Sequence, residues 1–207
     1  PISLLEAVSD ALERRQQQLG QGLELQVDAN GGWDADGARA MAPLLAERQV
    51  VLLEQPLAAR EDPEADCAAF AALEFDCPIP LVADESCWNL ADLVRLAPYV
   101  DGVNIKLLKS GGLSEALLMA RTAQRLGLEV MVGCYSDSAL LNGAAAQLLP
   151  LVRWPDLDSH LNLVDDPFEP PPLEGDRLRA GPGAGLGVSV RCGAWPTDSA
   201  VAGGSEC

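Results

Sequence analysis

Short runs of apolar and β-branched residues alternate along the chain with longer stretches in which apolar residues recur at helical spacing. A first amphipathic helix is predicted at 1–18. The apolar runs predict strands at 23–29, 50–56, 79–85, 102–108, 128–134 and 152–158. The stretches between them predict helices near 34–48, 64–74, 89–97, 112–126 and 137–149. This regular alternation is typical of a parallel sheet with helical crossovers, so the predicted fold class is α/β.

Three residues refine the helix boundaries. Asn89 precedes an apolar-periodic stretch and is a predicted N-cap, whereas Gly127 follows the helix near 112–126 and is typical of a C-terminal stop. Pro43 lies inside the helix near 34–48, where we expect it to kink or shorten that helix.

Four consecutive predicted strands each end in a polar residue at the corresponding position. Asp28, Glu54, Asp84 and Lys106 end four consecutive strands. In an open parallel sheet, ligand groups gather at one switch point, whereas in a barrel the carboxyl end of every strand opens into one shared mouth. The pattern therefore predicts part of a TIM-type barrel, with six βα units where a complete barrel has about eight.

Composition and charge exclude several kinds of partner. The formal net charge is −17 and the pI is near 4.2, so the chain would repel nucleic acid and anionic membrane surfaces. No apolar run reaches the length of about 18 residues that a membrane span needs. The start does not resemble a signal peptide, and the six cysteines form no C-x-x-C pair. We therefore expect a cytoplasmic protein with a small-molecule substrate.

Three carboxylates at the ends of successive strands indicate a metal site. Packed together, Asp28, Glu54 and Asp84 would repel one another unless a cation lay between them. Ligation by oxygen alone suits Mg²⁺. In the alternative interpretation, each acid only caps the helix that follows it.

Lys106, which ends the next predicted strand, is a candidate acid/base because lysine can release its proton and arginine does not. The chain has twelve arginines but only two lysines, Lys106 and Lys109. Alternation along the predicted strand places Lys106 on the face opposite Val103, Ile105 and Leu107. A nearby cation and partial desolvation would favour loss of its proton, which arginine does not release. The alternative is a lysine that only pairs with the acids, and Lys109 is expected to be a supporting charge.

Four motifs in this order, VDANGGW, LLEQP, VADES and NIKLLKSGG, resemble the enolase superfamily, and within it the muconate-lactonising-enzyme subgroup. The resemblance extends over about residues 20–190 and is strongest to dipeptide epimerases of the L-Ala-D/L-Glu type. It implies a modified (β/α)7β barrel. It also implies Mg²⁺ ligands at Asp28, Glu54 and Asp84, an acid/base at Lys106, and a site-lining role for Asn30.

The implied enzyme is an isomerase that removes the proton α to a carboxylate through an enediolate. In WPDLDSHLNL, Asp156 and Asp158 are two residues apart and are predicted to share one strand face. A comparable D-x-D in dipeptide epimerases holds the substrate's ammonium group, and Cys134 stands at a position that lines the pocket. A helix cap or a surface turn is the alternative for the two acids. We assign no catalytic role to His160, the only histidine.

Other activities stay open. An N-acylamino acid racemase, an o-succinylbenzoate synthase or a muconate-type cycloisomerase would share the same predicted core. The chain also departs from the family pattern, because it carries no N-terminal capping domain, no first strands and no K-x-K motif. We therefore expect a fragment or a truncated protein, and a non-catalytic metal-binding remnant is the alternative of another class. A homo-oligomer is a further expectation.

The C-terminal part of the chain has a different composition. We predict that residues 1–165 form the barrel portion and that residues 166–207 form a Pro- and Gly-rich tail whose last residues are disordered. Its run GPGAGLG has the composition of a phosphate-binding loop, but the sequence predicts no helix after it, which argues against nucleotide binding.

Overall fold

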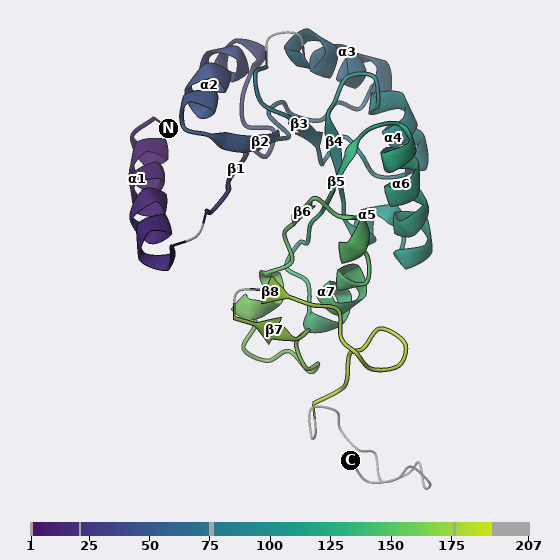
Figure 1. Cartoon of the computed structure of the whole chain (residues 1–207). Helices are drawn as coiled ribbons and strands as arrows, with labels where there is room; N and C mark the ends of the chain where they lie inside the picture. Colours follow the sequence, from purple (N-terminus) through teal and green to yellow (C-terminus); the bar gives the residue numbers. More distant parts are fainter. Residues whose placement is uncertain (1, 21, 75–76, 176, 192–207) are drawn as a thin grey trace, which may run out of the picture. The chain divides into compact units, whose positions relative to one another are not determined.

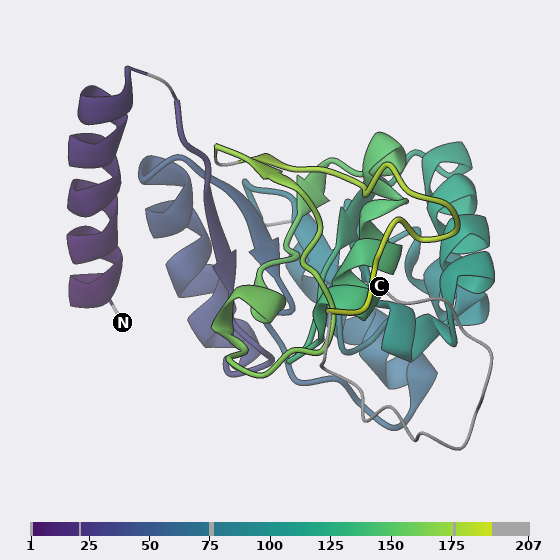
Figure 2. The same ribbon diagram turned by 90° about the horizontal axis from the view of Figure 1, so that it is seen from below.

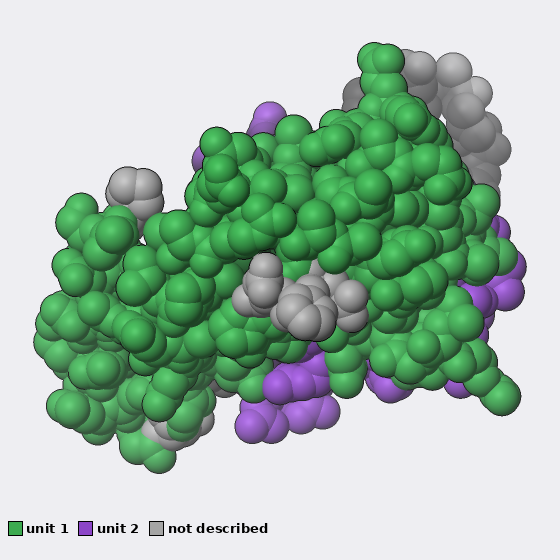
Figure 3. Space-filling view, turned by 90° about the horizontal axis from the view of Figure 1, so that it is seen from above, with its two compact units in different colours: residues 1–104, 123–129 green, residues 105–122, 130–207 purple. Residues whose placement is uncertain are grey.

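The computed structural model describes residues 2–20, 22–74, 77–175 and 177–191. The chain divides into two compact units, which Figure 3 colours separately. The first unit contains residues 1–104 and 123–129, and the second contains residues 105–122 and 130–207.

Parallel strands form the centre of the first unit, in the order β1-β2-β3-β4 (Figure 1). Asp28 lies opposite Glu54, and Glu54 lies opposite Val82. The carboxyl ends of these strands therefore meet at one edge of the sheet. Side chains of β2, β3 and β4 are almost all buried, as expected for parallel strands that are covered on both faces. The strands are β1 (Leu25–Asp28), β2 (Val50–Glu54), β3 (Leu81–Ala83) and β4 (Gly102–Ile105).

The helices of the first unit begin where the sequence predicts. Asp34 caps α2, because its side chain accepts the Gly37 N–H at 2.7 Å, and Asn89 forms a capping box with Asp92 at the start of α4. Pro43 lies inside α2, which nevertheless continues to Glu47, so the expected shortening is wrong. In Figure 1, α2, α3 and α4 run along one side of the sheet. The helices are α1 (Ile2–Leu19), α2 (Ala35–Glu47), α3 (Pro63–Glu74) and α4 (Leu90–Leu96).

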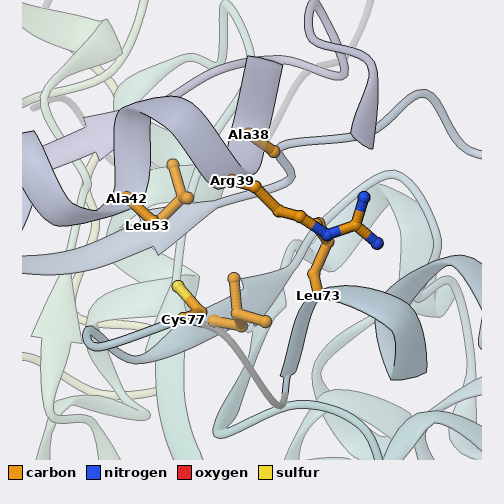
Figure 4. Close-up of a pocket in the computed structure, with 7 residues that line it drawn as sticks. Ala38, Arg39, Ala42, Leu53, Leu73 and Cys77 are labelled. Carbon is orange, nitrogen blue, oxygen red and sulfur yellow. The ribbon is translucent and has the colours of Figure 1, made fainter. Parts of the chain in front are cut away.

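The core of the first unit lies between α2, α3 and the sheet. Figure 4 shows Ala38 and Ala42 of α2 facing Leu53 of β2 and Leu73 of α3. The cavity among these side chains has a volume of about 10 Å³, the size of a single water site at most. It is a packing defect and not a ligand pocket.

In the second unit, β5 pairs in parallel with β6, with Met131 opposite Trp154. The N–H of Gly133, just after β5, donates to the carbonyl of Ile105 at 3.2 Å. The strands β5 (Glu129–Val132) and β6 (Trp154–Pro155) are accompanied by a short hairpin of β7 (Leu173–Glu174) and β8 (Arg177–Leu178). The helices are α5 (Leu107–Ser110), α6 (Leu113–Arg125), α7 (Ala139–Ala146), and the 3-10 turns η1 (Leu149–Leu151) and η2 (Ser159–Asn162). Figure 2 shows the same elements from below.

The glycine-rich tail packs by backbone contact. Gly181 and Gly187 approach so closely that a Cβ on either one would collide with the backbone of the other. Gly143 of α7 has no room for a Cβ either, because the Val188 side chain lies against it. Gln147 Nε2 also donates to the Leu186 carbonyl at 3.1 Å. The glycines of GPGAGLG therefore close the loop on itself and let the tail dock on α7.

The strands and helices predicted from the sequence are present, and each strand is shorter than predicted. Two strand predictions are wrong at their carboxyl ends. The strand predicted at 102–108 stops at Ile105, because Leu107–Ser110 adopt the helix α5, which ends at Gly111 with φ of 79°. The strand predicted at 152–158 stops at Pro155.

Among the described residues, no helix combines the length and hydropathy needed to cross a membrane. The predicted disorder of the last tail residues concerns 192–207, which lie outside the described residues.

Candidate active site

The predicted metal ligands lie at the carboxyl ends of neighbouring strands in the first unit. Asp28 and Glu54 are the last residues of β1 and β2, and Asp84 follows β3 directly. Glu54 and Asp84 are buried, with 3% and 1% of their surface exposed, whereas Asp28 is exposed. The sequence thus gave the correct strand-end position for each of the three acids.

A tight turn after β1 orients Asp28. The backbone N–H of Asn30 donates to Asp28 Oδ1 at 2.8 Å, and Asn30 Nδ2 donates to Oδ2 at 2.6 Å. Asn30 has a positive φ of 43°, which asparagine tolerates better than most residues. Gly31, with φ of 66°, follows it, and a Cβ there would lie 2.8 Å from Ala58 Cα. The VDANGGW motif therefore encodes a turn in which Asn30 contacts both oxygens of Asp28.

A buried asparagine holds Glu54. Asn104 Nδ2, on β4, donates to Glu54 Oε1 at 2.6 Å, and Asn104 is 1% exposed. An amide is neutral, so it fixes the carboxylate without cancelling its charge. Asn104 is not among the residues that the sequence predicts for the site.

Gln55 is a second residue that sequence reasoning missed. It is 0% exposed and has a positive φ of 33°. Its Oε1 accepts the backbone N–H of Asp84 at 2.9 Å, and its Nε2 donates to Ser86 Oγ at 2.9 Å and to the Leu57 carbonyl at 2.7 Å. Gln55 thereby fixes the backbone of a predicted ligand on the next strand. A glutamine directly after a strand-end acid was the available signal.

This donor set fits a hard divalent cation. Two buried carboxylates at adjacent strand ends favour a positive charge near them, and the three acids offer only oxygen. Oxygen ligation by a few carboxylates is the arrangement that Mg²⁺ usually adopts in proteins. Thiolate or imidazole ligands, which softer metals favour, are absent from this set of three.

In the second unit, Lys106 stands between the end of β4 and the start of α5. Its backbone is extended, with φ −114° and ψ 131°, and its surface is 8% exposed. Its Nζ lies 4.6 Å from the centroid of the Tyr135 ring. The predicted alternation of faces ends here, since Leu107 begins α5 and is 5% exposed while Leu108 is 59% exposed. Lys109, expected at the mouth as a supporting charge, is 8% exposed on α5.

The predicted substrate-binding residues of the second unit come together. Atoms of Cys134, Asp156 and Asp158 that could act as ligands all lie within 4.8 Å of one another. The predicted reason is wrong, however: the two acids do not share a strand face, because β6 ends at Pro155 and Asp158 precedes η2. A loop, and not the pleat of a strand, brings them together.

A buried polar network fixes the loops that carry these residues. Ser159 Oγ accepts the Asp137 N–H at 3.1 Å and donates to the Asp137 carbonyl at 3.1 Å. Asn142 Nδ2 donates to Ser159 Oγ and contacts His160 Nδ1, each at 2.9 Å. The loop after β5 is therefore tied to the loop after β6 through α7.

His160 is a packing residue in this network. Its Nδ1 lies 2.9 Å from the amide nitrogen of Asn142. Burial lowers the pKa of His160, and the carboxylates of Asp166 and Asp158 offset part of this effect. His160 is 5% exposed, and the expectation that it has no catalytic role stays a prediction.

Comparison with known proteins decides the family. A family model described as "Enolase C-terminal domain-like" matches residues 4–194. The chain belongs to this family. This membership confirms the resemblance to the enolase superfamily and the α/β barrel-type fold class.

The relatives of this enolase-family chain include epimerases. A "Hydrophobic dipeptide epimerase" of a Flavobacteria bacterium is 44% identical over 151 residues, which are 73% of this chain and 42% of that protein. An "L-Ala-D/L-Glu epimerase" of Escherichia coli is 44% identical over 141 residues, 68% of this chain and 41% of that protein. A dipeptide epimerase of Enterococcus faecalis, solved with Mg and L-Leu-L-Tyr, is 29% identical with a TM-score of 0.73, over 89% of this chain and 53% of that chain. This chain thus spans about two fifths of the length of these two curated relatives.

Proposed function

We propose that the protein to which this chain belongs is a Mg²⁺-dependent epimerase of dipeptides such as Ala-Glu. The observation that carries the dipeptide assignment is the group of Asp156, Asp158 and Cys134, whose atoms lie within 4.8 Å of one another. Two exposed acids outside the predicted Mg²⁺ set suit the ammonium end of a dipeptide. An N-acylated amino acid or a muconate has no such group.

Asp28, Glu54 and Asp84 would hold the Mg²⁺ ion. When bound, the ion supplies positive charge beside the substrate carboxylate and makes the adjacent α-proton more acidic. Asn30, Asn104 and Gln55 keep the acids and their backbone in place without adding charge, through the hydrogen bonds described above. The protein's own part at this site is to orient the ligands before substrate arrives.

Lys106 would take the α-proton onto Nζ and return it. A neutral amine is required for this step, and lysine can provide one where arginine cannot. Lys106 is 8% exposed, and its Nζ lies 4.6 Å from the centroid of the Tyr135 ring. Lys106 would serve one face of the α-carbon, and a base on the opposite face would complete the epimerisation.

Deuterium exchange at the α-carbon tests the proposal. The full-length gene product is incubated in D₂O with a panel of dipeptides and N-acylated amino acids, with Mg²⁺ and after chelation. We expect exchange of a dipeptide α-proton that depends on Mg²⁺. Absence of exchange with every dipeptide would refute the proposal, and exchange confined to N-acylated amino acids would favour the racemase alternative.

Asp158→Asn separates these substrate classes within one protein. Loss of a charged hydrogen-bond acceptor for the ammonium should lower kcat/KM for dipeptides about 10- to 100-fold. Turnover of any N-acylated substrate should stay nearly unchanged. Asp10→Asn on the exposed face of α1 is the matched control and should alter neither activity.

The predicted cytoplasmic location and homo-oligomeric state belong to the same proposal. The net charge of −17 supports an acidic soluble enzyme acting on a small molecule. Fractionation of cells and size-exclusion chromatography of the gene product check the two points.

A further inference from the structure

We propose that Tyr135 is a positioning residue for the proton-transferring amine: its ring holds Lys106 Nζ in one place through a cation–π contact. This inference rests on the proposed function, because it concerns the same amine. Tyr135 was not among the residues that the sequence pointed to, although it directly follows Cys134.

The geometry of the pair carries the inference. Lys106 Nζ lies 4.6 Å from the centroid of the Tyr135 ring, within the range of an energetically significant cation–π contact. The backbones that carry the two side chains are joined directly below, where the Gly133 N–H donates to the Ile105 carbonyl at 3.2 Å. Nζ and ring are therefore presented from two hydrogen-bonded strand ends.

The loop that carries the ring is itself held by buried groups. The backbone N–H of Tyr135 donates to Asp137 Oδ2 at 3.1 Å, and the Asp137 N–H donates to Ser159 Oγ at 3.1 Å. Asn142, which is 0% exposed, donates to the same Ser159 oxygen. These hydrogen bonds hold the backbone of Tyr135 in place.

An aromatic ring suits a lysine that must lose its proton. A lysine side chain has four rotatable bonds, and fixing its end group is what an acid/base step requires. A carboxylate at this position would also hold the ammonium, but it would stabilise the charged form strongly. The face of a ring attracts the ammonium more weakly and still offers apolar contact to the neutral amine. Tyr135 is 43% exposed, so its outer edge remains accessible to substrate.

The chain supplies its own spectroscopic probe, because Lys106 and Lys109 are its only lysines. In a ¹H–¹³C spectrum of the full-length gene product with selective ¹³C-lysine labelling, Lys106→Arg and Lys109→Arg assign the signals of these two lysines. A proton above an aromatic ring is shifted upfield, so the Cε protons of Lys106 should resonate upfield of those of Lys109. Tyr135→Leu should abolish this displacement, Tyr135→Phe should retain it, and Lys109 is the internal control.

A second experiment measures the consequence in the full-length gene product. For each dipeptide epimer separately, the rate of α-proton exchange without inversion is determined. Tyr135→Leu should slow exchange from the epimer that Lys106 serves by about 3- to 10-fold in kcat, with little change in KM. Exchange from the other epimer should change less, and Tyr135→Phe should restore the wild-type rate.

The two readouts separate failure of this inference from failure of the proposed function. The lysine spectrum needs no substrate and decides the Tyr135–Lys106 contact even if no dipeptide is turned over. An unchanged Lys106 signal in Tyr135→Leu, or equal displacement of both lysine signals, would overturn the inference. Equal slowing of exchange from both epimers would also overturn it, because a general loss of structure would act on both faces alike.

Discussion

The candidate functional residues of the first unit and those of the second unit are positioned in different ways. In the first unit, Asp28, Glu54 and Asp84 are placed by strands in register, and single amide side chains, Asn104 and Gln55, adjust them. In the second unit, the candidate side chains lie beyond the strand ends, on loops. Their positions depend on a network of buried side chains around Ser159 and Asn142.

This difference shows what positions a functional side chain accurately at a strand end and on a loop. A strand end in a parallel sheet has its position set by backbone hydrogen bonds to its neighbours, so an acid there needs little further support. A loop residue has no such frame, and its placement needs side-chain bonds from elsewhere in the chain. We therefore expect substitutions in the first unit to change Mg²⁺ affinity. Substitutions in the second unit should change the rate of proton transfer.

Lys106→Arg should have the largest effect. Arginine keeps the positive charge but does not release its proton, so α-proton exchange by the full-length gene product should fall about 10²- to 10⁴-fold. Lys109→Arg, at the other lysine, should retain most of the activity. Comparable losses in both variants would mean that the two lysines act together and that Lys106 is not the acid/base by itself.

Asn104→Ala should have the next largest effect, and the affected property is the Mg²⁺ affinity of the predicted ligands in the first unit. Without the amide, Glu54 loses a partner at 2.6 Å, so Mg²⁺ affinity should fall about 10- to 100-fold. Calorimetric titration with Mg²⁺ measures this directly, and Asn162→Ala at an exposed position is the control. Unchanged affinity would show that the strand register alone suffices to orient Glu54.

The smallest expected effect is a pH dependence of stability at His160. Burial lowers its pKa in the folded chain, so between that value and the unfolded pKa of about 6.5 only the unfolded chain binds the proton. The free energy of unfolding should therefore be highest above about pH 6.5 and should decrease as the pH falls below it. Urea unfolding at pH 7.5 and 5.5 measures the decrease, which His160→Asn should reduce. An identical decrease in both proteins would contradict a neutral, buried His160.

The sequence predicted the strand-end acids well for a physical reason. Each of Asp28, Glu54 and Asp84 ends an apolar run whose length and composition are local properties of the chain. The same local patterns wrongly predicted that Lys106 and Asp158 lie within strands. Two leucines follow Lys106 and fit a strand or a helix equally well, and Pro155 ends β6 before the alternation reaches Asp158.

The missed residues share another property. Gln55 contacts Ser86, Asn104 contacts Glu54, and Lys106 meets Tyr135, in each case across a wide separation in sequence. Such contacts depend on how the chain folds, and the hydrophobic periodicity of the sequence does not predict them. Family resemblance implied candidate metal ligands and a candidate base, but contacts between particular side chains required the structure.

The buried bond between Gln55 and Ser86 has an evolutionary consequence. A change at Ser86 alone removes one partner of the buried Gln55 amide, whereas a change at Gln55 also strands the Asp84 N–H and the Leu57 carbonyl. The fitness effect of one position thus depends on the state of the other, and substitutions there should be strongly non-additive. In lineages that diverge from this chain, Gln55 is expected to change more rarely than Ser86.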